Sequence, residues 1–211
     1  MVKEDSKFSH FITKCITIAM GVLTLLFLLL NLLKHDFSRD EWFLMKGILL
    51  YNKHKPEHAL KCFEKTESPL ALIYKGRIAL DKKEYESVIS IFTKYKGMDD
   101  WRIYYYLGVS YFWMKDFGNS INNLKRSLAI SPQREVFLTL SLIYGSIGEH
   151  KNAIDTLKKA LTIYPADKEL LYVLAVEYMR ISEIEKAKEV YEALEFLEPS
   201  LAKEWQPSFP Q

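Results

Sequence analysis

The hydrophobic and polar positions of this chain follow two different patterns. Residues 15–33, CITIAMGVLTLLFLLLNLL, form a run of nineteen positions without a charge. At about 1.5 Å of rise per residue, a helix of this length spans about 28 Å, close to the ~30 Å hydrocarbon core of a bilayer. From residue 40 onward, apolar residues recur instead at the three- and four-residue intervals of amphipathic helices. The pattern therefore predicts a transmembrane helix followed by an all-α domain.

A cleaved signal peptide is the alternative interpretation of residues 15–33. The run exceeds the usual signal-peptide core of about 7–15 residues, and Asn31 to Lys34 stand where a small-residue cleavage site would be needed. We therefore expect a retained single-pass anchor between an N-terminal tail, residues 1–14, and a juxtamembrane linker, residues 34–39. The side of the membrane on which the domain lies stays open, because three cations precede the run and three follow within a similar distance.

The amphipathic part repeats at intervals of 33 and 34 residues, which separate Pro132, Pro165 and Pro199. Each proline ends a similar segment. In this segment a large apolar residue follows a small residue by four positions, and another contact residue follows the large one by three positions. The three sets are Ser120, Leu124 and Ser127; Ala153, Leu157 and Ala160; and Ala187, Tyr191 and Leu194. These offsets place each set on one helical face, where small residues let a second helix come close.

A second amphipathic helix precedes each of these segments. Its apolar stripe has the offsets 0, 3, 4 and 7, with a small residue at the third place. The stripes are Tyr104, Leu107, Gly108 and Tyr111; Phe137, Leu140, Ser141 and Tyr144; and Leu171, Leu174, Ala175 and Tyr178. Turn-forming residues such as Gly148 separate the two helices, and Asp100, Ser131 and Asp167 are predicted N-caps. The sequence therefore predicts helix–turn–helix units in series.

These units resemble the tetratricopeptide repeat family, whose motif is a helix–turn–helix of about 34 residues. The resemblance is strongest over residues 101–199, and two shorter units match over residues 40–100. It implies a right-handed α-solenoid of about five units over residues 40–199, followed by a short capping segment and tail, residues 200–211. A capping-box pattern from Ser38 to Glu41 is expected to start the first helix.

The resemblance also implies a binding surface, because the first helices of such units line a concave groove. The corresponding positions are Leu44, Ile48, Tyr51, Ile73, Arg77, Tyr105, Val109, Phe112, Leu138, Leu142, Tyr172, Val176 and Met179. They lack the Lys, Asn and Arg clamp with which co-chaperones of this family hold a C-terminal carboxylate. As a set they are apolar and aromatic, as interaction surfaces are. We therefore expect a protein partner that inserts a hydrophobic helix or an extended segment, with Tyr105, Phe112 and Tyr172 as anchors.

Composition narrows the functional classes further. The chain has 29 Lys and Arg against 27 Asp and Glu, so no basic surface for nucleic acid is expected. Two cysteines, Cys15 and Cys62, are too few for a disulfide framework or a cysteine-based zinc site. The eight glycines are scattered and form no phosphate loop. We expect no enzymatic activity, no cofactor and no metal site.

Three interpretations of function remain at this point. The first is a membrane-anchored scaffold or adaptor that binds a protein partner through the groove and serves in the assembly or recruitment of a membrane complex. The alternative is a self-assembling, homo-oligomeric membrane protein. Its oligomer face would be the C-terminal end around Tyr191, Leu194 and Trp205, which a two-turn stub, residues 200–206, covers only in part. The third is a secreted protein whose mature chain lacks residues 1 to about 33.

Overall fold

The computed structural model describes residues 38–94 and 98–204. The predicted anchor, residues 15–33, lies outside these residues, as do the N-terminal tail, most of the linker and Trp205. Among the helices that are described, none is both long and apolar enough to cross a bilayer.

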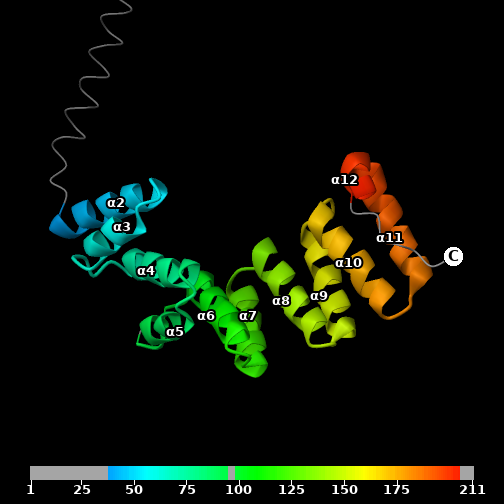
Figure 1. The fold of residues 1–211 in the computed structure, drawn as a ribbon, viewed down its shortest axis with the longest axis horizontal. Coiled ribbons are helices and arrows are strands. Elements are labelled where there is room, and N and C mark those ends of the chain that lie inside the picture. Colours follow the sequence, from blue (N-terminus) through cyan, green and yellow to red (C-terminus); the bar gives the residue numbers. More distant parts are fainter. Residues whose placement is uncertain (1–37, 95–97, 205–211) are drawn as a thin grey trace, which may run out of the picture.

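The described residues form eleven helices and no strand. Ten of the helices pair into five consecutive antiparallel hairpins, which follow one another along a curved array (Figure 1). The hairpins are α2 (Arg39–Asn52) with α3 (Pro56–Phe63), α4 (Pro69–Asp81) with α5 (Tyr85–Thr93), α6 (Trp101–Trp113) with α7 (Phe117–Ile130), α8 (Arg134–Ser146) with α9 (His150–Ile163), and α10 (Lys168–Arg180) with α11 (Ile184–Leu197). The short helix α12 (Pro199–Glu204) follows the fifth hairpin. The all-α solenoid that the repeat pattern predicts is therefore confirmed.

Close approach of the two helices in a hairpin depends on a small residue in the first helix, as predicted. A methyl group added to Gly76 would lie 2.1 Å from the Phe92 ring, and one added to Gly108 would lie 2.6 Å from Leu124. These large partners are 2% and 0% exposed. Glycine is therefore required where the ring or the leucine side chain lies against the helix backbone.

The turn inside every hairpin has the same backbone geometry. One residue in each turn has a positive φ, and only the fourth hairpin places a glycine there. These residues are His54 (φ 56°), Lys83 (φ 62°), Lys115 (φ 63°), Gly148 (φ 82°) and Ser182 (φ 61°). The amide that follows this residue donates to the carbonyl five positions back, for example Glu149 to Tyr144 at 2.8 Å. This pair of features is the left-handed helix cap that reverses the chain in a short turn.

The helix starts agree with two of the three predicted caps. The Asp100 and Asp167 carboxylates accept hydrogen bonds from the Arg102 and Leu170 backbone amides, at 2.9 and 3.0 Å. Ser38 and Glu41 form the predicted capping box at the start of α2. The prediction for Ser131 is wrong, because α8 begins three residues later and the Ser131 hydroxyl instead accepts from the Gln133 side chain at 2.7 Å.

Helix α12 covers part of the C-terminal end of the array and leaves Phe196 88% exposed. Helix α12 lies against α11 (Figure 1), and Ala202 belongs to the same apolar cluster as Tyr191 and Leu194. The Tyr191 hydroxyl donates to the Ala202 carbonyl at 2.5 Å. Tyr191 is 9% exposed and Leu194 is fully buried, so these two side chains form no open surface while α12 is in place. The expectation of a partly open face therefore does not hold at these two positions.

Candidate functional site

The candidate site is the face that the first helices of the five hairpins present. One residue from each of α2, α4, α6, α8 and α10 occupies the same helical position. These are Ile48, Arg77, Val109, Leu142 and Val176, the last four separated by 32, 33 and 34 residues. The line is apolar except for Arg77. A contiguous row of this kind can receive an extended or helical segment along its length.

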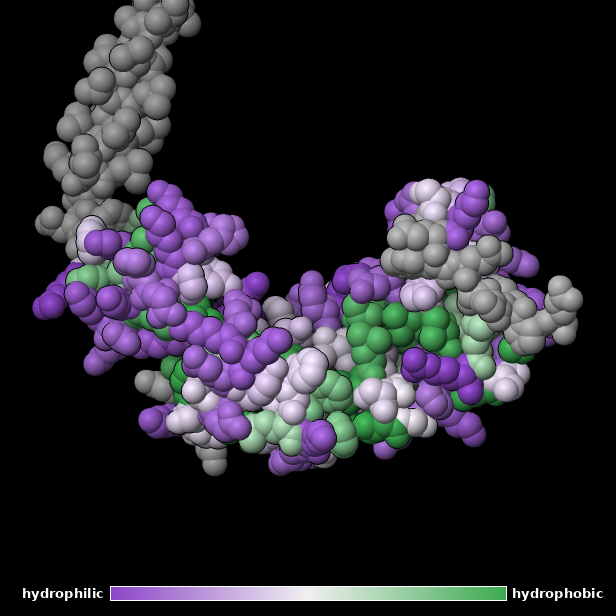
Figure 2. All heavy atoms as spheres, viewed as in Figure 1, coloured by the Kyte–Doolittle hydropathy of each residue, from purple (hydrophilic) through white to green (hydrophobic). Residues whose placement is uncertain are grey.

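The C-terminal half of this face is the more apolar part. Leu142 is 50% exposed, and Leu138, Tyr172, Val176 and Met179 are half-buried. Apolar residues gather between α8 and α10 in Figure 2, within the inner curve of the array. Leu138, Tyr172 and Met179 also pack against the core cluster of the fourth and fifth hairpins. Their positions are therefore fixed on one side by the core while the other side stays accessible.

The three residues of the middle hairpin have a double role. Tyr105, Val109 and Phe112 are all half-buried. Tyr105 and Phe112 contact the core cluster that includes Leu140 and Tyr144. The Tyr105 hydroxyl accepts a long, 3.5 Å hydrogen bond from Thr139 of the next first helix. The two predicted aromatic anchors therefore support the packing between hairpins as well as lining the face.

Ile73 does not line the face. It is 5% exposed and lies in one core cluster with Phe92, Ile103 and Tyr106. The packing of α6 against α4 covers this position, while the equivalent Leu44, Tyr105, Leu138 and Tyr172 stay half-buried. Ile73 is therefore a core residue that links two hairpins.

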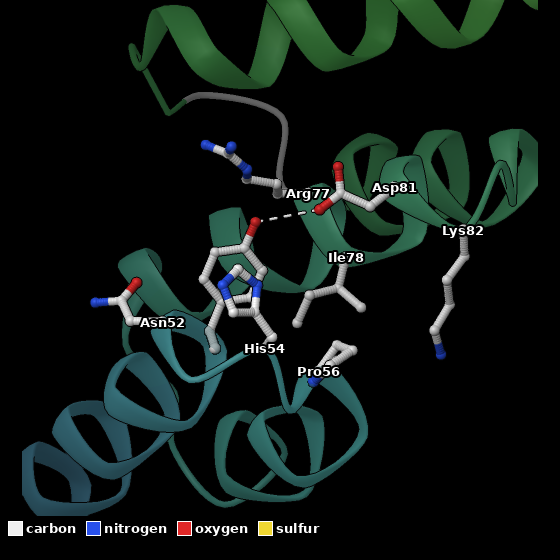
Figure 3. Close-up of a pocket in the computed structure, with 8 residues that line it drawn as sticks. Asn52, His54, Pro56, Arg77, Ile78, Asp81 and Lys82 are labelled. Atoms are coloured by element: carbon white, nitrogen blue, oxygen red, sulfur yellow. Dashed lines mark hydrogen bonds between the residues drawn. The ribbon is translucent and has the colours of Figure 1, made fainter.

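The N-terminal half of the face contains a hollow of about 740 Å³ between the ends of α2 and α4. Figure 3 shows Arg77 and Asp81 on one side of this hollow, with His54 and Pro56 across from them and Lys82 pointing away. The Tyr51 hydroxyl donates to the Asp81 carboxylate at 3.1 Å, and the Arg77 guanidinium lies 5.8 Å from the centre of the Tyr51 ring. Burial raises the pKa of the Tyr51 hydroxyl. The negative charge of Asp81 raises this pKa further, whereas the positive charge of Arg77 lowers it.

A second hollow of about 470 Å³ shares Arg77 and Asp81 with the first. Its other lining residues are Leu80, Trp101, Tyr105, Tyr106, Gln133 and Glu135. Burial raises the pKa of the Tyr106 hydroxyl, and the Arg77 guanidinium acts in the opposite direction. Arg77 therefore stands between two hollows, beside two tyrosines that stay neutral donors at physiological pH.

Several residues that line these hollows were not predicted from the sequence. Asp81 lies four positions after Arg77, and Trp101 lies four positions before Tyr105. Extending the face by one helical turn in each direction would have found both of them, because residues four apart share a face. Glu135 lies seven positions before Leu142, which is two helical turns away on the same face.

The polar and ligating side chains of the described residues form few clusters. Over 38–94 and 98–204, no group of three or more His, Cys, Asp or Glu side chains could hold a metal ion. Cys62 is 7% exposed and lies in the core. The face therefore offers apolar area, aromatic edges and one arginine, which suit a peptide segment more than a reacting group.

A curved series of helical hairpins with a first-helix face of this kind defines a helical-repeat solenoid. Residues 135–167 match the family model for the tetratricopeptide repeat. This match identifies the fourth hairpin as a tetratricopeptide repeat, as the sequence pattern predicts.

Relatives and solved structures agree with this family. The chain is 27% identical over 108 residues to the BBSome complex member BBS4 of Bos taurus, and 31% identical over 81 residues to that of Mus musculus. These matches cover 50% and 38% of this chain but only 21% and 16% of the relatives, so the chain spans a small part of their length.

The fold is also that of two solved proteins. A crystal structure of MamA matches 82% of this chain and 98% of its own, with a TM-score of 0.67 and 20% identity. YrrB, described as a TPR protein with an unusual peptide-binding site, matches 77% of this chain and 89% of its own, with a TM-score of 0.62 and 19% identity. At these identities the likeness shows the shared fold.

Proposed function

We propose that this chain is a non-enzymatic scaffold that binds an apolar protein segment on its first-helix face. The observation that carries the proposal is the half-exposed row of Val109, Leu142 and Val176, with Leu142 50% exposed at its centre. Leu138, Tyr172 and Met179 flank this row and are held by the core on their other sides. Side chains that are already fixed lose little conformational entropy on binding, which favours affinity.

The chemistry of the partner follows from the two halves of the face. Its apolar half suits side chains spaced along a helix or an extended segment. Its polar half offers the exposed Arg77 guanidinium, which can bind carbonyl or carboxylate oxygens at one end of the segment. The peptide-binding site of YrrB, a protein with the same fold, supports a peptide or protein as ligand.

We further propose that residues 15–33 anchor this scaffold in a membrane. Their nineteen uncharged positions match the thickness of a bilayer, and the linker to the first hairpin is short. Anchoring would hold the binding face close to partners on the same membrane and so raise their effective concentration. Such a scaffold would serve in the recruitment or assembly of a membrane complex.

A photo-cross-linking experiment tests the binding face. Two full-length variants carry benzoylphenylalanine, one in place of Leu142 and one in place of Ile163, which is 47% exposed on the second helix α9. Cross-links to a partner in native membranes are expected from position 142 and not from position 163. Equal cross-linking from both positions would show that the first-helix face is not the binding surface.

A further inference from the structure

The outer face of α2 presents an apolar stripe at the N-terminal end of the array. Trp42, Met45 and Leu49 are 48%, 53% and 54% exposed. Their spacing of three and four residues places them on one side of the helix. The other side of α2 carries Gly47 and Ile48, which pack toward α3 and α4. Helix α2 is therefore apolar on two faces, of which the hairpin packing uses only one.

Cations flank this stripe. Arg39 precedes Trp42 by three residues, and Lys46 and Lys53 follow Trp42 and Leu49 by four residues each. The three cations therefore border the stripe along one edge. The Lys46 ammonium lies 4.5 Å from the centre of the Trp42 ring. The acidic residues of α2 are engaged elsewhere, because Glu41 accepts hydrogen bonds from Ser38 and Asp40 accepts one from the Glu67 amide at 3.4 Å. The stripe is thus bordered by cations along one edge, while Glu41 lies on the other edge, four positions before Met45.

The two ends of the array differ in how their apolar residues are covered. Figure 1 shows α2 at one end and α12 at the other. Helix α12 covers Tyr191 and Leu194 of α11 and leaves Phe196 88% exposed. On α2, in contrast, Trp42, Met45 and Leu49 form a continuous stripe of half-exposed side chains. Solenoid ends normally present a polar face to water. A stripe of three large apolar side chains at such an end marks a contact surface.

We propose that this face of α2 lies on the surface of a phospholipid bilayer. The inference rests on the proposed anchor, because Leu33 ends the uncharged run and Ser38 caps α2. The five intervening steps reach at most roughly 17–18 Å, so α2 would begin close to the membrane surface. Tryptophan beside apolar residues suits the boundary between headgroups and acyl chains, and the bordering cations suit anionic headgroups.

Contact with lipid would also fix the orientation of the array. A helix that lies in the interface buries its apolar face by roughly 5–10 Å. The hairpins that follow α2 would then extend from the membrane at a set angle instead of swinging on the linker. The first-helix face would be presented to partners in one orientation.

Quenching of tryptophan fluorescence by brominated lipids tests the contact. The full-length chain is reconstituted in vesicles of phosphatidylcholine with phosphatidylserine, in which the acyl chains of the phosphatidylcholine are brominated. The chain has four tryptophans, so Trp42→Phe is compared with Trp113→Phe, which removes a residue that is 59% exposed in the third hairpin. The quenched part of the emission is expected to fall roughly twofold or more in Trp42→Phe and to stay unchanged in Trp113→Phe.

A charge variant and a lipid change extend the same experiment. Replacing Lys46 and Lys53 by Glu is expected to reduce the quenching of Trp42, and vesicles without phosphatidylserine are expected to have a similar but smaller effect. Circular dichroism of each variant checks that the helices are retained.

The outcomes separate this inference from the proposed anchor. If the chain resists alkaline carbonate extraction but Trp42→Phe leaves the quenching unchanged, the contact is wrong and the anchor stands. If carbonate extracts the wild-type chain, the anchor and the contact both fail. A disulfide-linked dimer of a Met45→Cys variant in the vesicles, without quenching of Trp42, would show that a second copy covers the stripe instead.

Discussion

Single side chains decide how closely the helices of each hairpin pack. Gly76 of α4 lies against the Phe92 ring, which is 2% exposed. The same relation joins Gly47 with Phe63 in the first hairpin, so the first three hairpins share the requirement. In the last two hairpins Ser141 and Ala175 occupy this position. A glycine inside a helix costs about 1 kcal/mol relative to alanine, and the tight contact must outweigh that cost.

Substitution of Gly76 tests this balance. Gly76→Ala is expected to lower the free energy of unfolding by about 1–3 kcal/mol, because the new methyl group would lie 2.1 Å from a ring atom that the core holds in place. Urea denaturation of the full-length chain measures the change. Gly118→Ala is the control, since its methyl group would have 3.9 Å to the nearest atom. Adding Phe92→Leu to Gly76→Ala is expected to recover part of the loss, and no recovery would contradict the contact.

Short segments at the ends of the helices fix how one unit follows the next. The Arg134 guanidinium, at the start of α8, forms ion pairs with Asp167 and Glu169 at the start of α10, the latter at 2.7 Å. One repeat further along, Lys168 pairs with Glu198 at 2.5 Å. Asp167 is also the N-cap of α10. These charges therefore tie the start of one first helix to the end of the next loop.

The pH dependence of stability tests the pair at Asp167. Burial alone would raise the pKa of this carboxyl, but the hydrogen bonds from Arg134 and from the Leu170 amide outweigh it and hold the pKa below its usual value. Because the pKa is lower in the folded chain, the pair stabilises the fold above about pH 4 and this contribution is lost as the pH falls further.

Asp167→Asn isolates the ion pair, because asparagine can still cap the helix. At neutral pH the variant is expected to be less stable than the wild-type chain by about 1 kcal/mol, and the difference is expected to disappear in acid. Urea denaturation at several pH values measures both quantities. A difference that stays constant through the acidic range would assign the effect to the cap instead of the charge.

Substitutions in the hairpin turns test whether the positive φ that the turns share affects stability. Lys115 adopts a φ of 63°, a backbone conformation that costs glycine less free energy than a residue with a side chain. Gly148 adopts a φ of 82° in the equivalent turn, and there the residue is already glycine. Lys115→Gly is therefore expected to raise stability by about 0.5–1 kcal/mol, and Gly148→Ala to lower it by about 1 kcal/mol. Thermal denaturation of both variants measures these shifts. Changes of the same sign in both would contradict the shared turn geometry.

Much of this element structure could be predicted from the sequence, because hydrophobic periodicity and repeat spacing are strong local signals. The stripes of small and large residues gave the hairpins, and carboxylates before a stripe gave two of the N-caps. Ser131 failed as a cap because its hydroxyl is used within the loop. Local sequence does not show which of several polar residues the tertiary structure will align with a helix end.

The candidate site was less predictable, because exposure depends on the neighbouring hairpin. Ile73 has the same position in its helix as Tyr105 and Leu138, yet the packing of α6 against α4 buries it. The coverage of Tyr191 by α12 likewise depends on a contact between two elements. Arg77 was found from the sequence, but the two hollows beside it form only when residues of α2, α4, α6 and α8 come together.

The whole molecule combines three surfaces with different chemistry. Its inner face changes from polar hollows around Arg77 to an apolar row centred on Leu142. At its C-terminal end α12 covers Tyr191 and Leu194, and its N-terminal end presents Trp42 with bordering cations. This polarity from one end to the other favours a scaffold that is fixed at its N-terminal end and binds a partner toward its C-terminal half.

The affinity of a selected peptide tests the binding face in isolation from any membrane. Peptides chosen from a random library against the full-length chain in detergent are expected to carry apolar residues at helical or alternating spacing. Titration calorimetry then compares Leu142→Asp with Ile163→Asp, which replace residues of similar exposure on the first and second helices. We expect Leu142→Asp to weaken binding at least about tenfold and Ile163→Asp to leave it unchanged. Equal affinities of the two variants for the selected peptides would contradict the proposed role of the first-helix face.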